Sequence, residues 1–335
     1  MTPTPRRIGP FTVAPIGLGC MNLNHAYGVP PSPEDGARLL NRALDLGVSL
    51  IDTAALYGGG NNERLIGSAI LHRRAEFTLA SKCVLDMIDG KRALDGSPEA
   101  ITRTVLGSLE RLGTDHIDLV YLHRPDHRVP IEESVGALVK LKDQGKIGAI
   151  GLSEMSSETI RRAHAVHPIA AVQTEYSPAV RNPEIAVLET CRALGIAFVA
   201  FSPVARGLLA GAVHDDSYAP GDIRSFMPRF TGGNLAHNLS IVAAFDALAA
   251  EIGATPAQLA IAWTLSRGDH VVPIPGTGSI AHLEENMAAL DVPITPELTA
   301  RIDAILPPGA LRGPRYPAAM QAQVTTETFA DEELA

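Results

Sequence analysis

The sequence predicts a single α/β domain folded as a (β/α)8 barrel. Short apolar runs rich in Val, Ile and Phe alternate with longer amphipathic runs along most of the chain. The short runs are apolar on both faces, as the strands of a parallel sheet covered by helices require. There are eight such runs, and each is followed by a segment with helical character, which is the pattern of a closed barrel.

The strand-like runs are bounded by Gly or Pro and are too short for helices. They cover residues 16–19, 49–54, 77–82, 117–123, 149–153, 171–175, 197–202 and 270–275.

The helical segments begin with recognisable capping residues. Ser32, Ser97 and Thr255 each precede a proline at the first helical position, and an amphipathic stretch follows. The helix after Ser32 stops at Gly47, and the helix after Ser97 stops at Gly113. Further helices are expected at 61–71, 131–144, 156–166, 183–195, 237–252 and 255–267.

A doubly wound open sheet is the alternative fold. It predicts a G-x-G-x-x-G turn after the first strand, but Gly17 and Gly19 are followed by no third glycine in register. We therefore favour the barrel, with residues 1–15 as a plug or hairpin before it and 307–335 as a polar tail. The Gly- and Pro-rich stretch 203–236 after the seventh strand is too long for a simple connection and indicates a functional loop.

Composition excludes several classes of protein. The chain has 28 Lys and Arg against 37 Asp and Glu, and this net charge of −9 argues against a protein that binds nucleic acid or anionic membranes. Cys20, Cys83 and Cys191 are far apart and predict neither disulfides nor a zinc site. The N-terminal residues have no apolar signal-peptide core, and no apolar run is long enough to span a membrane. These features predict a reduced, cytoplasmic protein.

Four polar residues lie at or just beyond the carboxyl ends of neighbouring strands, where barrels carry their chemistry. Asp52, Lys82 and His123 end the second, third and fourth strands, and Tyr57 follows Asp52 by five residues. Each alone has an ordinary structural explanation, such as a turn, a surface lysine or a packed ring. Together they are expected to converge on one pocket, since neighbouring strands lie only about 5 Å apart.

This set suits proton transfer to a carbonyl oxygen. A tyrosine is a weak acid with a pKa near 10, but an ammonium about 4 Å away favours the phenolate by up to ~4 kcal/mol. Lys82 is therefore expected to make Tyr57 a general acid, with Asp52 holding the lysine. A neutral His123 would orient the substrate oxygen.

With these residues in place, the sequence resembles the aldo-keto reductase superfamily, in particular its bacterial and plant branch. The resemblance spans about residues 8–305. The motifs that carry it are GLGCMNLNHAYG (17–28), IDTAALYG (51–58), ASK (80–82), LHRPD (122–126), GLSE (151–154), QTEYS (173–177), FSPVARGLL (201–209) and IPGTGSIAHLEEN (274–286).

The resemblance implies a catalytic tetrad of Asp52, Tyr57, Lys82 and His123 and a nicotinamide cofactor. Ser153 and Gln173 match positions that hold the carboxamide, Glu154 stands where many relatives have Asn, and Phe201 would stack on the nicotinamide ring. Met21 also falls among the expected cofactor contacts. The loop that crosses the pyrophosphate matches Ser202, Pro203, Val204, Arg206, Gly207 and Leu208.

The adenosine end is less typical of the family. Relatives usually carry Lys or Arg around the 2′-phosphate, whereas this chain has Gly276, Thr277, Ser279 and His282. Glu285 and Asn286 match the adenine contacts. NADPH is expected as the cofactor, with NADH possible because no permanently charged side chain remains at these positions.

The resemblance implies an enzyme that reduces an aldehyde or ketone to an alcohol, taking hydride from nicotinamide C4 and a proton from Tyr57. Its partner would be a small carbonyl substrate, with neither nucleic acid nor membrane. Met21, Asn22, His25 and Tyr27 would line one rim of the pocket and the 203–236 loop the other. A cofactor-binding regulatory subunit resembling potassium-channel β subunits is the alternative. A metal-dependent hydrolase is disfavoured, because the first strand has no His.

Overall fold

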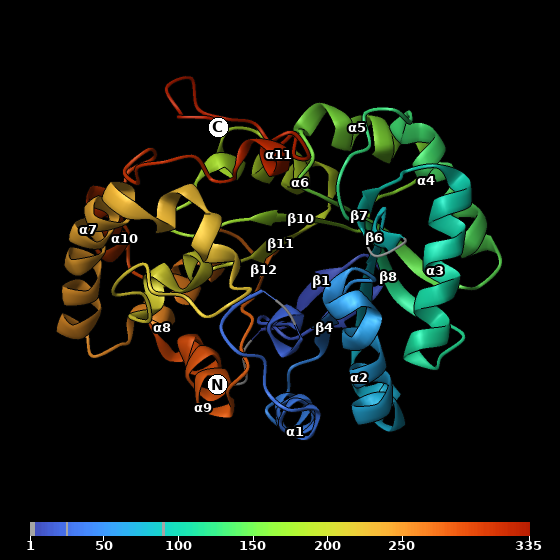
Figure 1. Cartoon of the computed structure of the whole chain (residues 1–335), viewed down its shortest axis with the longest axis horizontal. Helices are drawn as coiled ribbons and strands as arrows, with labels where there is room; N and C mark the ends of the chain where they lie inside the picture. Colours follow the sequence, from blue (N-terminus) through green and yellow to red (C-terminus); the bar gives the residue numbers. More distant parts are fainter. Residues whose placement is uncertain (1–3, 25, 89–90) are drawn as a thin grey trace.

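The computed structural model describes residues 4–24, 26–88 and 91–335. Its central feature is an eight-stranded parallel sheet in the order β12-β11-β10-β9-β8-β5-β4-β3, surrounded by helices (Figure 1). The first and last strands meet, because the Gly17 amide donates to the Pro273 carbonyl at 3.0 Å and Gly19 pairs with Gly276. The sheet therefore closes into the predicted (β/α)8 barrel.

All eight predicted strands are present. They are β3 (Leu18–Gly19), β4 (Leu50–Asp52), β5 (Thr78–Cys83), β8 (Ile117–Leu122), β9 (Ile147–Ser153), β10 (Ala171–Glu175), β11 (Ala197–Phe201) and β12 (Val271–Ile274).

The expected helices form around them, and their caps explain where they start. The Ser32 hydroxyl accepts from the Asp35 amide, Ser97 accepts from Ala100, and Thr255 forms a reciprocal capping box with Gln258. These helices are α1 (Pro33–Asp45), α2 (Asn61–Ile70), α3 (Pro98–Leu112), α4 (Ile131–Asp143), α5 (Ser157–Val166), α6 (Val187–Leu194), α7 (Gly232–Glu251) and α8 (Pro256–Leu265).

Most buried apolar side chains pack in two layers. The larger layer lies between the strands and the outer helices, and the smaller one fills the barrel interior. At the amino-terminal end, the hairpin of β1 (Arg6–Ile8) and β2 (Phe11–Val13) adds Ile8 and Val13 to the interior layer. The hairpin predicted in residues 1–15 thus closes the bottom of the barrel and leaves the opposite end for a site.

Several elements were not predicted. A second hairpin, β6 (Leu85–Ile88) and β7 (Lys91–Leu94), extends beyond β5. After β12, the helix α9 (Ile280–Met287) is the one expected to follow the eighth strand, whereas α10 (Pro296–Ile305) and α11 (Ala318–Gln321) are additional. The long stretch after β11 contains three short 3-10 helices, at Ala205–Ala210, Ile223–Phe226 and Pro228–Phe230.

The segment 307–335, expected as a polar tail, lies against the barrel and reaches past α5 and α6 (Figure 1). The Thr325 amide donates to the Glu154 carbonyl at 2.9 Å, and the Asn182 side chain donates to the Glu327 carbonyl at 3.1 Å. Arg315 and Tyr316 are buried. The segment is therefore part of the wall at the carboxyl end of the barrel.

None of the helices within the described ranges is, by itself, both long enough and apolar enough to cross a membrane. The sharply bent pair α7 and α8 meets those two criteria only when taken together.

A close approach of α2 to α3 gives a stability prediction. A Cβ added at Gly67 would lie 2.2 Å from the Leu112 carbonyl oxygen, whereas one added at Gly136 in α4 meets nothing within 4 Å. Gly67→Ala is expected to lower the free energy of unfolding by about 1–3 kcal/mol. The added methyl group would clash with the backbone of α3, which cannot move aside as a flexible side chain would. Gly136→Ala is the matched control and is expected to raise it by up to about 1 kcal/mol. Urea unfolding checks both, and equal effects at the two positions would contradict the explanation.

Candidate active site

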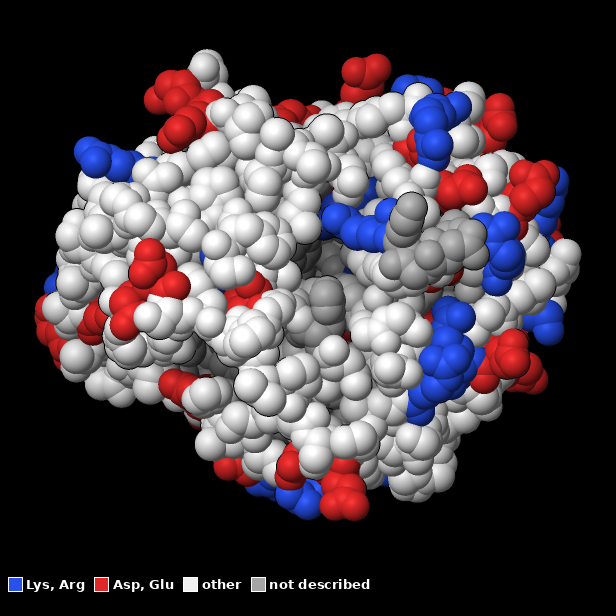
Figure 2. All heavy atoms as spheres, viewed as in Figure 1, with Lys and Arg blue, Asp and Glu red and all other residues white. Residues whose placement is uncertain are grey.

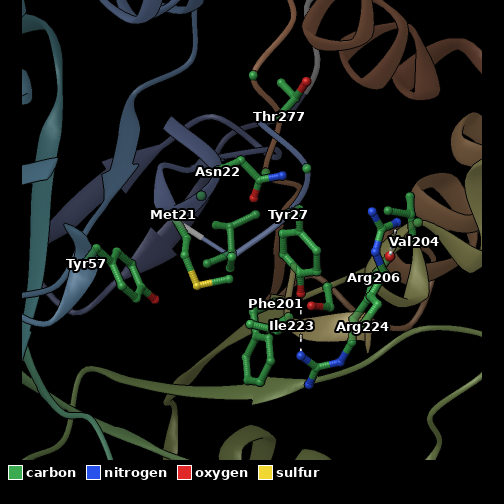
Figure 3. A pocket seen from close by; sticks show the side chains of 18 of the residues that line it. Met21, Asn22, Tyr27, Tyr57, Phe201, Val204, Arg206, Ile223, Arg224 and Thr277 are labelled. Carbon is green, nitrogen blue, oxygen red and sulfur yellow. Dashed lines mark hydrogen bonds between the residues drawn. The ribbon is translucent and has the colours of Figure 1, made fainter. Parts of the chain in front are cut away.

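A large cavity opens at the carboxyl ends of the strands, with a volume of about 1070 Å³. Ordinary ligand clefts occupy about 300–1,000 Å³, so this one has room for a dinucleotide and a small second ligand. Loops following β3, β4, β8, β11 and β12 contribute to its walls, and Figure 3 shows several of the side chains that line it.

Strand register explains why three of the predicted polar residues meet. Asp52 of β4 pairs with Ala80 of β5. Ala80 precedes Lys82 by two positions, so Ala80 and Lys82 lie on the same face of β5. Lys82 in turn pairs with Tyr121 of β8, and Tyr121 precedes His123 by two positions at the end of that strand. Because side chains alternate along a strand, all of them point to the same side of the sheet, the barrel interior. The stagger carries them progressively toward the carboxyl end.

The Lys82 ammonium uses its three protons within the site. It donates to the Thr53 carbonyl at 2.8 Å, to the Tyr57 hydroxyl at 3.2 Å, and to the Asp52 carboxylate. Lys82 is 1% exposed and Asp52 is 2% exposed, so this ion pair lies in a medium of low polarity. The Gln173 side-chain amide donates to the other oxygen of Asp52 at 2.8 Å.

Burial and the ion pair set the protonation of this group. Burial alone would lower the pKa of Lys82, but Asp52 and Tyr57 raise it above its ordinary value, so the ammonium stays charged. Burial also raises the pKa of Tyr57, and Lys82 offsets only part of that rise. The prediction that Lys82 lowers the tyrosine pKa overall is therefore corrected: desolvation of the phenolate outweighs the ammonium, and Tyr57 keeps its proton at neutral pH.

His123 lines the cavity beside Tyr57. The two rings meet edge to face, with centroids 5.9 Å apart. Burial, together with the positive charges of Arg124, Lys82 and Arg92, lowers the pKa of His123 well below its ordinary value. The ring is therefore neutral near pH 7. Its buried Nδ1 has no hydrogen-bond partner among the described residues.

Asn62, at the start of α2, is a supporting residue that the sequence did not reveal. Its side chain donates to the Cys20 carbonyl at 2.8 Å and accepts from the Thr53 hydroxyl at 2.6 Å. It therefore joins the loop after β3 to the residue whose carbonyl holds Lys82. Only the contact between distant segments shows this role, since the sequence places Asn62 in an ordinary helix.

Most residues expected to contact the cofactor line the cavity. Around the tetrad and the loop after β11 they are Met21, Ser153, Gln173, Phe201, Ser202, Pro203, Val204, Arg206 and Gly207. At the far end they are Gly276, Thr277, Ser279, His282, Glu285 and Asn286. Leu208 does not line the cavity, because its side chain is buried in the outer apolar layer.

Glu154 does not line the cavity either, so its expected contact with the carboxamide is corrected. Its carboxylate accepts from Arg315 at 2.8 Å, from the Thr326 hydroxyl at 2.7 Å and from the Glu175 amide at 3.0 Å. With these partners it anchors the C-terminal segment. The resemblance could not show this, because the partners come from a segment beyond the motifs.

Arg206 shares that buried charge network. Its guanidinium donates to the Tyr27 hydroxyl at 3.4 Å (Figure 3). It also donates to Glu175 at 2.8 Å and lies over the Tyr316 ring. Ser202, Ala205 and Arg206 have positive φ angles of 51°, 49° and 57°, and Gly207 follows at 91°. Such runs of left-handed backbone form concave nests of amides that favour anions.

Two loops approach each other across the mouth of the cavity. Asp222 accepts from the Gly28 amide at 2.8 Å, and the Ile223 amide donates to the Ala26 carbonyl at 2.9 Å. Met21, Asn22 and Tyr27 line the cavity on one side and Arg224 lines it on the other (Figure 3). The predicted rim residue His25 lies outside the described residues. Part of the 203–236 stretch thus borders the site, as expected for a functional loop.

Cys20 and Cys83 are fully buried, and burial raises the pKa of both thiols, to about 12 for Cys83. Across the described ranges no cluster of three or more His, Cys, Asp or Glu has the arrangement of a metal site.

A (β/α)8 barrel with this polar group at its carboxyl end is the architecture of a class of oxidoreductases. Residues 15–307 match the model of the aldo/keto reductase family, and the chain belongs to that family. It is 41% identical over 313 residues to probable aldo-keto reductase 1 of Glycine max, covering 91% of this chain and 89% of the relative. It is 40% identical over 331 residues to the aldo-keto reductase yakc of Schizosaccharomyces pombe, named for NADP(+), covering 96% and 97%.

Solved structures agree with the family. The glycerol dehydrogenase AKR11B4 from Gluconobacter oxydans superposes with a TM-score of 0.83 at 28% identity, over 100% of both chains. An aldo/keto reductase from Klebsiella pneumoniae, solved in complex with NADP and acetate, gives a TM-score of 0.73 at 28% identity, over 95% of this chain and 99% of the other.

The C-terminal anchor gives a second prediction. Arg315→Leu is expected to lower the free energy of unfolding by about 3–5 kcal/mol at pH 7, because it leaves two buried carboxylates without their shared cation. Arg301→Leu breaks the exposed pair with Glu251 and serves as the control, with an expected loss below about 1 kcal/mol. Urea unfolding measures both.

The same variant has a pH signature. Burial alone would raise the pKa of Glu175, but Arg206 and Arg315 lower it to about 2 in the folded state, from an ordinary value of 4.5. The resulting stabilisation is fully present above about pH 4.5 and is lost as pH falls toward 2. Arg315→Leu should shrink this acid-dependent loss, and an unchanged pH dependence would count against the network.

Proposed function

We propose that the protein is an NADPH-dependent carbonyl reductase that converts an aldehyde or ketone to an alcohol. One observation carries the proposal: the Tyr57 hydroxyl accepts a hydrogen bond from Lys82 at the edge of a cavity large enough for a nicotinamide dinucleotide and a substrate. Since the tyrosine oxygen accepts from the lysine, its own proton is free to be donated to a ligand in the cavity.

Tyr57 acts as the general acid in this proposal. Its raised pKa keeps the hydroxyl protonated before reaction. As the carbonyl oxygen gains negative charge, that proton moves to it, and the tyrosinate left behind lies 3.2 Å from the Lys82 ammonium. Asp52 keeps the lysine charged and fixed in position. The low polarity around the pair strengthens this stabilisation relative to water.

His123 binds and orients the substrate oxygen in the same proposal. A neutral imidazole offers one N–H donor and is a weaker acid than the tyrosine hydroxyl. It can therefore hydrogen-bond the substrate oxygen while Tyr57 supplies the proton. The edge-to-face contact with the Tyr57 ring fixes the relative orientation of the two groups. A carbonyl oxygen placed between them would receive two hydrogen bonds.

The residues present fit a nicotinamide dinucleotide. Ser153 and Gln173 would hold the carboxamide, and the face of Phe201 would contact the nicotinamide ring. The left-handed backbone at Ser202 and at residues 205–207 would meet the pyrophosphate. Ser279 precedes α9 without capping it, which leaves helix amides available to an anion. When bound, the cofactor supplies the hydride. The naming of the yeast relative for NADP(+) and the NADP complex of the Klebsiella enzyme support this proposal.

Replacing the general acid tests the function. Tyr57→Phe is expected to lower kcat for carbonyl reduction by about 10²–10⁴-fold, the usual contribution of a positioned acid. The assay follows nicotinamide absorbance with a panel of aldehydes and ketones. Tyr176→Phe is the control, because that hydroxyl contacts Glu184 and does not face the cavity. A Tyr57→Phe enzyme that retained more than a tenth of the wild-type turnover would overturn the assignment.

Cofactor preference has its own test. NADPH is expected to give the higher kcat/KM, with weak discrimination against NADH, because Gly276, Thr277, Ser279 and His282 stand where relatives usually carry Lys or Arg. His282→Arg adds a permanent charge at an exposed position of α9 and should raise the NADPH-to-NADH ratio by about fivefold or more. Equal or better kcat/KM with NADH in the wild-type protein would contradict the preference.

A further inference from the structure

The cavity divides into two ends that differ in how their positive charges are balanced. At the proposed nucleotide end, Arg206 is paired with Glu175 and Arg224 with Asp222. At the other end, beside His123, Arg92 from β7 and Arg124 after β8 also line the cavity. In Figure 2 basic side chains border the central hollow of the surface.

Arg92 and Arg124 donate only to neutral acceptors. Arg124 donates to the His123 carbonyl at 2.7 Å and to the Ser153 hydroxyl at 3.2 Å, and Arg92 donates to the Gln323 side chain at 2.8 Å. Among the described residues, no carboxylate lies within 4.0 Å of either guanidinium. Each guanidinium has five N–H donors, so both retain donors for a ligand.

The two charges also act on each other and on the tetrad. Burial and the nearby charge of Arg124 lower the pKa of Arg92, and both arginines contribute to the lowered pKa of His123. Holding like charges close together without a counter-ion is unfavourable, and an anionic ligand would relieve that cost. Arginine pairs commonly serve to bind carboxylate or phosphate groups through forked hydrogen bonds.

We infer that this end of the cavity binds the anionic group of the substrate, so that the preferred substrate is an aldehyde or ketone carrying a carboxylate or phosphate. The inference rests on the proposed reductase function and names its substrate class. Arg124 directly follows His123, which places the proposed anion site close to the oxygen-binding group. Apolar side chains also line the cavity and suit a hydrocarbon or aromatic spacer; they include Leu85, Met87 and Met320.

Matched substrates test the inference. Reduction of 4-carboxybenzaldehyde and of 4-formylphenyl phosphate is compared with that of 4-formylbenzamide, which has the same ring and a neutral substituent. The charged substrate that fits should have a kcat/KM about tenfold or more above that of the amide, since a charge-assisted hydrogen bond is worth about 1.5–3 kcal/mol and 1.4 kcal/mol is tenfold. The two anionic substrates distinguish a carboxylate site from a phosphate site. The advantage should fall as salt concentration rises.

Arginine variants assign the effect to the cavity. Arg92→Gln should lower the ratio of kcat/KM between the charged substrate and the amide by about fivefold or more, and adding Arg124→Gln should abolish the preference. Arg301→Gln, in an exposed pair far from the cavity lining, is the control and should leave the ratio unchanged. No preference in the wild-type protein, or a preference that survives the double substitution, would overturn the inference while leaving the reductase function in place.

Binding keeps the inference testable if the protein reduces none of the three aldehydes. Terephthalate, a dicarboxylate of the same shape, is titrated into the protein with NADP(+) by calorimetry. Binding that Arg92→Gln weakens about fivefold or more supports the anion site even where the reductase function has failed. Absence of binding, or binding that the variant does not change, contradicts it.

Discussion

The buried ion pair between Lys82 and Asp52 constrains the rest of the site. Taking two charges out of water costs several kcal/mol for each ion, and only close pairing with further hydrogen bonds repays it. Here the ammonium is satisfied by a carboxylate, a backbone carbonyl and the Tyr57 hydroxyl. The backbone that carries these acceptors must therefore stay in place. Asn62 helps to hold it through hydrogen bonds with the Thr53 hydroxyl and the Cys20 carbonyl.

A second buried charge network connects the parts of the cavity wall. Glu154 follows β9, and Glu175 ends the neighbouring strand β10. Both carboxylates pair with Arg315 from the C-terminal segment, and Glu175 also pairs with Arg206. Through these contacts the segment that contributes Tyr316, Met320 and Gln323 to the cavity is joined to the loop after β11. The C-terminal part of the cavity wall and the loop after β11 thus depend on the same set of ion pairs.

The charges of the cavity are consistent with two different ligands meeting at the tetrad. At one end, arginines are already paired with carboxylates and strained backbone presents its amides. At the other end, two arginines contact neutral acceptors within the described structure. Tyr57 and His123 line the same cavity, with their rings edge to face.

The sequence by itself determined the barrel and the edge of it that carries the candidate site. Hydrophobic runs of strand length, Pro-assisted helix caps and polar residues at strand ends are local signals, and a parallel register converts them directly into neighbouring positions. This is why the eight strands and the grouping of Asp52, Tyr57, Lys82 and His123 were predictable. The tertiary structure alone decided the rest: that Glu154 faces Arg315 and not the cavity, that burial outweighs Lys82 in setting the pKa of Tyr57, and that Arg92 and Arg124 share one end of the cavity. Those outcomes depend on desolvation and on contacts between segments far apart in the chain, which no local pattern records.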